Sequence, residues 1–205
     1  MTAHRVGIMG GTYNPVHYGH VIAARVAAEL LDLESVILSP VSRPWHKTAQ
    51  DLAPAEDRLS MLELALAEDP EFLVTTVDLD RGGDTYTIDT LDDLDALFAE
   101  QYPDETVEWF FLAGADAISG LASWKSPEEL LRRAQFVAVT RPGHELVLPD
   151  VEGADDIMVL EIDAANISST EVRERAARGE SLEDLVPELV AEYIVEHGLY
   201  SSPGA

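Results

Sequence analysis

The chain of 205 residues has no cysteine, which excludes disulfides, thiolate metal sites and cysteine nucleophiles. Basic residues are scarce, because 13 lysines and arginines stand against 39 acidic residues and give a formal net charge of −26. A surface this acidic repels nucleic acid and anionic membranes, so neither is an expected partner. The sequence also lacks an apolar run of membrane-spanning length and an N-terminal signal, which favours a cytoplasmic protein.

The scarcity of basic residues makes the position of each one informative. Only two of them are lysines, Lys47 and Lys125, and each stands close to a tryptophan. An anionic substrate would need local positive charge within the negative field of this protein. The candidates to supply that charge are His17, His20, Lys47, Arg81, Arg141 and Arg173.

Short apolar segments alternate with helical patterns along the chain, which predicts an α/β fold with a doubly wound parallel sheet. Strands are expected at residues 5–9, 35–38, 72–77, 108–113, 136–140 and 158–162. Helices are expected at about 15–31, 55–68, 87–98, 170–178 and 187–196, with another that begins at Pro127. The sequence has no linker or internal repeat, so residues 1–205 are expected to form a single domain whose C-terminal helices start at about residue 169.

Two of the expected helices begin with a proline that follows a capping residue. Asn14 precedes Pro15, and Ser126 precedes Pro127. Asparagine and serine side chains accept hydrogen bonds from the free N–H groups at the start of a helix, and proline suits its first position. Each pair therefore predicts a helix N-terminus at the proline.

The most informative stretch, GGTYNPVHYGH, runs from Gly10 to His20 between the first strand and the first helix. Glycines let a backbone approach a polyphosphate closely, and the free N–H groups at a helix start point toward it. His17 and His20 are three residues apart, so on a helix they share a face. Donors fixed there would stabilise the negative charge that builds up when the α-phosphate of a nucleotide is attacked. The stretch therefore indicates nucleotidyl transfer.

A nicotinamide dinucleotide would also bind at a glycine-rich turn. That turn has the pattern G-x-G-x-x-G, and an acidic residue near the end of the second strand holds the ribose. Here the glycines are Gly7, Gly10 and Gly11, and the second strand runs into the sequence SPVS, which contains no acid. Both features disfavour a dehydrogenase.

A second motif, ISSTEVR, extends from Ile167 to Arg173. Serine and threonine ahead of a glutamate could simply cap a helix, with Arg173 as a solvated residue on it. Alternatively, this helix start is a second anion site that faces the first across one crevice, and Arg173 reaches the β- and γ-phosphates. The presence of the stretch from Gly10 to His20 in the same chain favours the second interpretation.

These motifs resemble those of the bacterial nicotinate-nucleotide adenylyltransferases, which belong to the HxGH nucleotidyltransferase superfamily and have a Rossmann-like nucleotidyltransferase fold. The first is similar to the family pattern GGTFDPxHxGH, with Asn14 where the family usually has aspartate, and ISSTEVR matches ISSTxxR. Further resemblances are RPWHK at 43–47, RGGDTYTIDTL at 81–91, and FLAGAD at 111–116 with Trp124 eight residues on. The resemblance covers nearly the whole chain, and the loss of one charge at Asn14 is not expected to abolish function.

The resemblance implies that ATP and nicotinate mononucleotide give nicotinate adenine dinucleotide and pyrophosphate, without a covalent enzyme intermediate. It implies that Mg²⁺ arrives with ATP, since no carboxylate cluster resembles a metal site, and a homo-oligomer remains open. It assigns catalytic roles to His17, His20 and Arg173. It assigns ATP binding to Gly10, Gly11, Thr12, Gly114, Asp116, Ile167, Ser168, Ser169 and Thr170. It assigns binding of the mononucleotide to Lys47, Tyr86, Thr87, Trp124 and Lys125.

Within this assignment the Asp116 carboxylate would accept hydrogen bonds from ribose hydroxyls. Trp124 would stack on the pyridine ring, although a tryptophan so close to a strand end is also a natural core residue. Thr87 and the backbone of Lys125 would hold the carboxylate of that ring, and Lys47 would lie near the phosphate of the mononucleotide.

Three alternatives remain to be weighed. Phosphopantetheine adenylyltransferase is a relative, but it looks shorter and lacks the Y-T-x-D-T-L element. A nucleotide-sensing module would bind without turnover, yet a sensor has no need of transition-state donors such as His17, His20 and Arg173. A class I synthetase fragment would need a lysine-rich KMSKS-like loop, which the two lysines of this chain cannot form.

Overall fold

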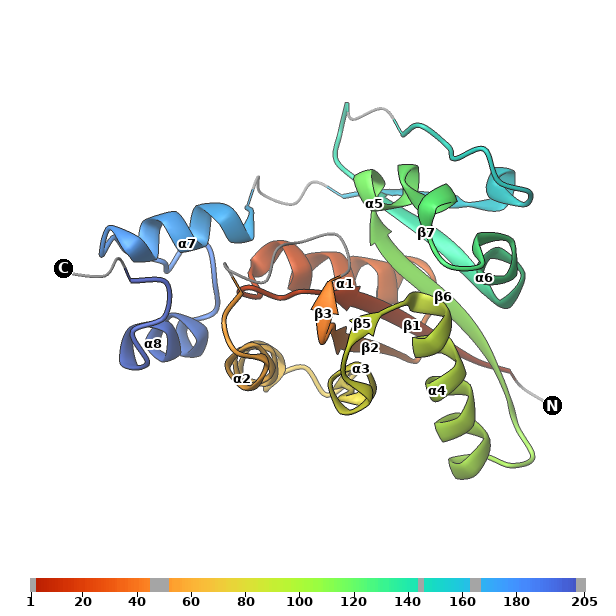
Figure 1. Ribbon diagram of the computed structural model, residues 1–205, viewed down its shortest axis with the longest axis horizontal. Helices are drawn as coiled ribbons and strands as arrows, with labels where there is room; N and C mark the ends of the chain where they lie inside the picture. Colours follow the sequence, from red (N-terminus) through yellow and green to blue (C-terminus); the bar gives the residue numbers. More distant parts are fainter. Residues whose placement is uncertain (1–2, 45–51, 144–145, 163–166, 202–205) are drawn as a thin grey trace.

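The computed structural model describes residues 3–44, 52–143, 146–162 and 167–201. A six-stranded sheet runs through its centre in the order β4-β2-β1-β6-β7-β8, and every neighbouring pair in it is parallel (Figure 1). The strands are β1 (Ala3–Gly11), β2 (Ser35–Pro40), β4 (Phe72–Val74), β6 (Thr106–Gly114), β7 (Ala134–Thr140) and β8 (Met158–Glu161). Chain order reverses between β1 and β6, where doubly wound sheets bind ligands at the carboxyl ends of the strands. The predicted doubly wound sheet is confirmed.

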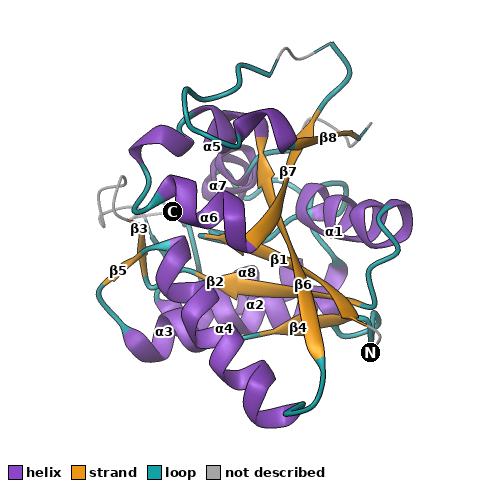
Figure 2. Cartoon of the chain, turned by 90° about the vertical axis from the view of Figure 1, so that its right-hand side faces the viewer, coloured by secondary structure: helices purple, strands orange, loops and turns teal. Residues whose placement is uncertain are grey.

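Helices cover both faces of the sheet. One face packs against α1 (Tyr18–Leu30), α2 (Ala55–Leu66), α7 (Ser169–Ala177) and α8 (Glu188–Glu196). The other packs against α3 (Val77–Arg81), α4 (Thr87–Gln101), α5 (Ala115–Ser119) and α6 (Pro127–Arg133). Figure 2 shows α4 and α6 in front of the sheet and α2 and α8 behind it. Short pieces complete the fold: β3 (Arg43–Pro44) pairs with β5 (Asp84–Thr85), and 3-10 turns lie at Leu121–Ser123 and Ala154–Asp156.

The apolar run of β6 shows why this sheet is buried on both sides. Successive strand residues point to opposite faces. Trp109 and Phe111 accordingly lie in the core with α4 and α6, whereas Phe110 and Leu112 lie in the core with α1 and α2. A continuous apolar run, rather than an alternating one, is what a central parallel strand requires. Among the described residues no helix is both long and apolar enough to cross a membrane.

The predicted helix start at Asn14 and Pro15 is wrong. Helix α1 begins at Tyr18, with His17 as the residue before its first turn. Asn14 is buried, and its Oδ1 accepts hydrogen bonds from the N–H of Ala53 and from the hydroxyl of Tyr200, each at 2.9 Å. Its side chain therefore connects distant segments instead of capping a helix.

Two other local predictions need correction. The third strand ends at Val74 rather than at residue 77, and Val77 begins the short helix α3. Helix α6 does begin at Pro127, but Ser126 has a left-handed backbone, with φ of 54°, and its side chain makes no capping hydrogen bond. The remaining expected elements form at their predicted places, with ends that differ by up to three residues.

Candidate active site

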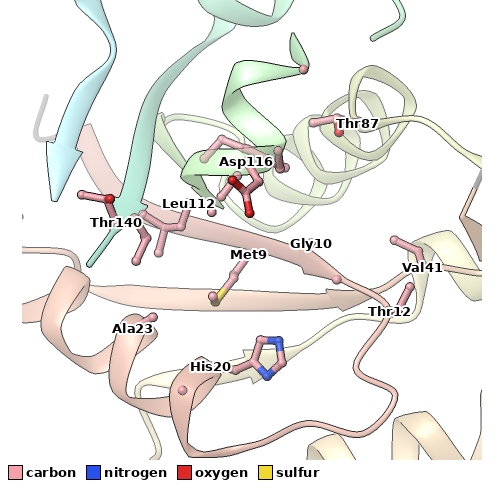
Figure 3. A pocket seen from close by; sticks show the side chains of 18 of the residues that line it. Met9, Gly10, Thr12, His20, Ala23, Val41, Thr87, Leu112, Asp116 and Thr140 are labelled. Atoms are coloured by element: carbon pink, nitrogen blue, oxygen red, sulfur yellow. The ribbon is translucent and has the colours of Figure 1, made fainter. Parts of the chain in front are cut away.

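A cavity of about 920 Å³ lies at the carboxyl ends of β1, β6 and β7 (Figure 3). Its walls come from the start of α1, the start of α4, the segment from β6 to α6, and Ile167, two residues ahead of α7. The volume suits a small-molecule site. Twelve of the predicted site residues line it: Gly10, Gly11, Thr12, His17, His20, Tyr86, Thr87, Gly114, Asp116, Trp124, Lys125 and Ile167.

The glycine turn, residues 10–17, is built around a buried tyrosine. Tyr13 is 1% exposed, its φ is 45°, and its hydroxyl donates to the carbonyl of Met9. A Cβ at Gly11 would lie 3.0 Å from Cζ of Tyr13, which is closer than a side chain normally tolerates. Gly11 therefore lets the tyrosine ring fold beneath the turn and support it from the core side.

The two histidines lie together where α1 begins. The N–H of His17 donates to Nδ1 of His20 at 3.3 Å, and the ring centroids are 3.8 Å apart. Because Nδ1 of His20 accepts this bond, a neutral His20 ring carries its proton on Nε2. Figure 3 shows the ring of His20 at the edge of the cavity.

Burial governs the charge of His17. Its exposed fraction is 7%, and the desolvation that results lowers its pKa to about 4. The imidazole is therefore neutral at pH 7, so the positive potential at this point comes from the N-terminus of α1. The first turn of α1 contains no acidic residue that would offset this potential. The arrangement favours an anion at the start of α1.

Gly19 makes room for the His17 ring. A Cβ at this position would lie 2.9 Å from Nδ1 and 3.0 Å from Cε1 of His17. The glycine between the two histidines is therefore required by packing inside the site. This contact explains the third position of the HxGH motif.

We expect Gly19→Ala to lower kcat by ~10-fold, because small displacements of positioned groups are costly in catalysis. The variant should remain folded, since only one methyl group is added. Gly120→Ala is the matched comparison, because it adds the same methyl group elsewhere in the cavity lining, where the Cβ would make an ordinary contact of 3.5 Å with the carbonyl of Ala117. Steady-state adenylyl transfer by the two variants measures the effect. Equal activities would show that the His17 ring has no fixed role.

Asp116 lies on the opposite side of the cavity from His20. Strand β6 ends at Gly114, and Asp116 falls in the first turn of α5. Figure 3 shows its carboxylate pointing into the cavity, and a Cβ at Gly114 would meet no atom within 4 Å. A carboxylate beside open space is a suitable acceptor for the hydroxyls of a ribose.

Trp124 and the start of α4 form another wall. Trp124 is half-buried, and its ring packs edge-on against Phe111 and Phe136, with centroids 6.0 and 6.3 Å away. Trp124 also lines the cavity. Its ring therefore packs partly against the core and is partly accessible to a ligand.

Thr87 is the first residue of the 15-residue helix α4, whose first N–H groups have no partner within the helix.

The side chain of Lys125 is already engaged within the protein. Its Nζ forms an ion pair with Oδ1 of Asp89 at 2.7 Å and lies 5.1 Å from the centroid of the Tyr86 ring. The carboxylate offsets the lysine charge. An anionic group in this part of the cavity would therefore depend on backbone N–H groups more than on the ammonium.

Apart from Ile167, the predicted site residues of the ISSTEVR motif do not line the cavity, and two of them, Ser169 and Arg173, contact the glycine turn. Ser168 caps α7 by accepting from the N–H of Glu171 at 3.1 Å, as the capping interpretation predicts. Ser169 Oγ donates to the carbonyl of Pro15 at 2.9 Å. Of the motif's predicted site residues, Ile167 lines the cavity, whereas Ser168, Ser169, Thr170 and Arg173 do not.

Arg173 also contacts the glycine turn. Its Nη1 donates to the carbonyl of Asn14 at 2.9 Å, and its Nη2 donates to Oγ1 of Thr170 at 3.2 Å. Both acceptors are neutral oxygens, so these contacts leave the positive charge of the guanidinium beside the turn. Its reach to the β- and γ-phosphates stays a prediction.

The remaining basic residues that were predicted to supply positive charge to the site do not all lie at the cavity. Arg141 lines the cavity just after β7, whereas Lys47 falls outside the described residues. Arg81 does not line the cavity, because its guanidinium is held by Asp78 at 2.8 Å and Asp93 at 2.7 Å. The expectation that Arg81 supplies charge to the site is therefore wrong.

Sequence reasoning missed two buried charged residues behind the site. Asp78 is 1% exposed and accepts from Ser39, Arg81 and Thr90, which joins α3 and α4 to the end of β2. Arg58 lies inside the protein on α2, behind the glycine turn. A signal for Arg58 was available, since it precedes Met61, Leu62 and Ala65 at the spacing of one apolar helix face.

A parallel sheet with an HxGH turn at its switch point, and a second helix start packed against that turn, define a nucleotidyltransferase. Residues 8–175 match the family model described as cytidylyltransferase-like. The chain is 48% identical over 196 residues to a protein of Acidothermus cellulolyticus, covering 96% of this chain and 94% of the relative. It is 46% identical over 204 residues to a protein of Corynebacterium jeikeium, and this match covers 95% of this chain and 99% of the relative. Both carry the name "Probable nicotinate-nucleotide adenylyltransferase", and the chain belongs to this family.

Solved structures agree with this fold. The nicotinic acid mononucleotide adenylyltransferase of Plasmodium falciparum, complexed with NaAD, superposes with a TM-score of 0.74. The match covers 96% of this chain and 97% of that one at 19% sequence identity. A second structure, from Vibrio parahaemolyticus, gives a TM-score of 0.68 at 17% identity over 96% and 95% of the two chains. At these identities the likeness concerns the fold.

Proposed function

We propose that this protein transfers the adenylyl group of ATP to nicotinate mononucleotide, giving nicotinate adenine dinucleotide and pyrophosphate. The observation that carries the proposal is the composition of one cavity. It joins the His17–His20 pair at a helix start to Asp116 on the opposite side, and it extends to Trp124 and the start of α4. These walls suit a phosphate chain, a ribose and an aromatic ring that bears a carboxylate.

In the proposed reaction a phosphate oxygen of the mononucleotide attacks the α-phosphorus of ATP. The bond from that phosphorus to the bridging oxygen of the β-phosphate breaks, and pyrophosphate leaves with the electron pair. Nε2–H of His20 and the N–H groups at the start of α1 donate to phosphate oxygens as their negative charge grows. Such donors are effective because they are already oriented before the reaction.

Mg²⁺ is proposed to enter as part of the ATP substrate. Among the described residues no three histidine, aspartate or glutamate side chains cluster as ligands of a metal ion. The glycine turn offers backbone and imidazole N–H groups, which bind phosphate oxygens directly. This donor set fits an ATP molecule whose own oxygens carry the cation.

Pyrophosphate release from ATP and Mg²⁺ tests the proposal, with nicotinate mononucleotide, nicotinamide mononucleotide or phosphopantetheine as the acceptor. The expected result is release with nicotinate mononucleotide and formation of the dinucleotide. Release only with phosphopantetheine would assign the chain to another adenylyltransferase. ATP binding without release under any condition would favour a sensing module.

We expect nicotinate mononucleotide to be preferred over the nicotinamide form by at least ~10-fold in kcat/KM. Backbone N–H groups near Thr87 and Lys125 suit an acceptor-only carboxylate, whereas a carboxamide leaves its NH₂ mispaired at a cost of ~1–3 kcal/mol. The preference should survive Lys125→Ala, because Asp89 already holds that ammonium. Steady-state kinetics with both mononucleotides measure it. Equal use of the amide would contradict the prediction, and loss of preference in the variant would assign recognition to the lysine side chain.

A further inference from the structure

Arg58 makes a set of contacts that the proposed reaction does not explain. It lies on α2 and is only 1% exposed. Its guanidinium donates to four backbone carbonyls: Nη1 to Thr12 at 2.8 Å and Val41 at 2.9 Å, Nε to Ala53 at 3.2 Å, and Nη2 to Ser42 at 3.3 Å. One side chain thus joins the glycine turn, the segment after β2 and the residues just ahead of α2.

Among the residues that the structure describes, no carboxylate neutralises the charge of Arg58. Each of its hydrogen bonds ends on a carbonyl, and no acidic side chain within the described ranges forms an ion pair with it. Arg25, Arg133 and Arg175 of the same chain all pair with aspartate or glutamate. A buried charge is costly unless it is compensated. In a chain with 39 acidic residues, a buried arginine that pairs with none of the described carboxylates calls for a function.

The position of the guanidinium points to that function. Thr12 and Val41 both line the cavity (Figure 3). Because Arg58 donates to the carbonyls of both residues, it lies directly behind this part of the cavity wall. In a planar trans peptide the C=O and the following N–H point in opposite directions. Holding the Thr12 carbonyl toward Arg58 therefore turns the N–H of Tyr13 away from Arg58. Arg173 holds the Asn14 carbonyl of the same turn, again through neutral acceptors only.

We propose that Arg58 is a positioning residue for the polyphosphate of ATP, which fixes the shape of the glycine turn and places an uncompensated positive charge behind it. The proposal rests on the proposed function, since it requires the phosphates to lie at this turn. Arg58 acts through the backbone and through its field and does not touch the nucleotide. Its effect should therefore grow with the number of phosphates on the ligand.

Equilibrium binding of MgATP and of adenosine, each without a second substrate, tests this role. Wild type should bind MgATP more tightly than adenosine. Arg58→Met should weaken MgATP by at least ~10-fold, because a charge is lost near several phosphate charges, and should change adenosine affinity by less than twofold. Arg58→Lys should fall between, since lysine keeps the charge but cannot span four carbonyls. The matched control is Leu62→Ala, which empties a fully buried position on the same helix.

Each outcome of these binding measurements either supports or contradicts the role proposed for Arg58. A loss confined to MgATP in the Arg58 variants, and absent from Leu62→Ala, supports it. Equal losses for both ligands, or none, would make Arg58 a packing residue. If Arg58→Met does not fold, the same comparison is made with Arg58→Lys alone. A wild type without preference for MgATP would overturn the placement of the phosphates and this inference together, whereas a preference without pyrophosphate release would contradict only the proposed reaction.

Discussion

His20→Ala should lower kcat by at least ~100-fold, the size of effect seen when one transition-state donor is lost. The structure gives the physical reason. His20 receives the N–H of His17 on Nδ1, which places the proton of the neutral ring on Nε2 at the edge of the cavity. Alanine removes this donor and leaves the backbone N–H groups of α1 in place. ATP should therefore still bind, and the loss should appear in kcat more than in KM.

His197→Ala is the matched control for this experiment. His197 is exposed and stacks on Tyr193 with centroids 3.8 Å apart, outside the cavity lining. It should keep wild-type kinetics. A His20→Ala enzyme with near-normal kcat and a raised KM would make His20 a ground-state binder and contradict the mechanism. His17→Ala should behave like His20→Ala, because the two rings pack against each other.

Trp124→Ala should weaken nicotinate mononucleotide and leave ATP almost unaffected. Stacking of an aromatic side chain on a base is worth ~1–3 kcal/mol, which corresponds to roughly a 5- to 150-fold loss. The indole lines the same cavity as the start of α4 and the histidine pair. The separate KM values for the two substrates measure the effect. A stacking residue changes only one of them.

Phe136→Leu separates stacking from packing. Phe136 is buried and touches the indole of Trp124, with centroids 6.3 Å apart, but it does not line the cavity. This variant should lower thermal stability while both KM values stay near those of wild type. If Trp124→Ala instead lowers stability and affects both substrates alike, the tryptophan is a core residue.

Much of the fold and the centre of the site could be predicted because short stretches of the sequence determine them. The apolar run of β6 and the glycines beside His17 and His20 each have a short-range physical meaning. The prediction failed where a side chain serves a distant partner. Asn14 looks like a helix cap from its neighbours alone, yet its Oδ1 is used by Ala53 and Tyr200.

The same reason explains why the partners of the residues behind the site could not be predicted. Arg58 and Asp78 are polar residues in apolar surroundings, and only the tertiary structure shows which carbonyls and hydroxyls surround them. The side chains of ISSTEVR were expected to contact phosphate directly. In the structure Ser169 and Arg173 donate to carbonyls of the glycine turn, so the two motifs are in direct contact although they are far apart in the sequence. Their contact with phosphate stays a prediction.

The contacts of the glycine turn also set an order of assembly. The carbonyl of Asn14 accepts from Arg173, 159 residues later in the chain, and the carbonyl of Pro15 accepts from Ser169, 154 residues later. The side-chain oxygen of Asn14 accepts from the hydroxyl of Tyr200, 186 residues later. Synthesis proceeds from the N-terminus, so the sheet core can form while these partners have not yet been made. The turn that comes first in translation is thus the last part of the site to be completed. A ribosome-bound chain lacks a finished nucleotide site until Tyr200 has emerged.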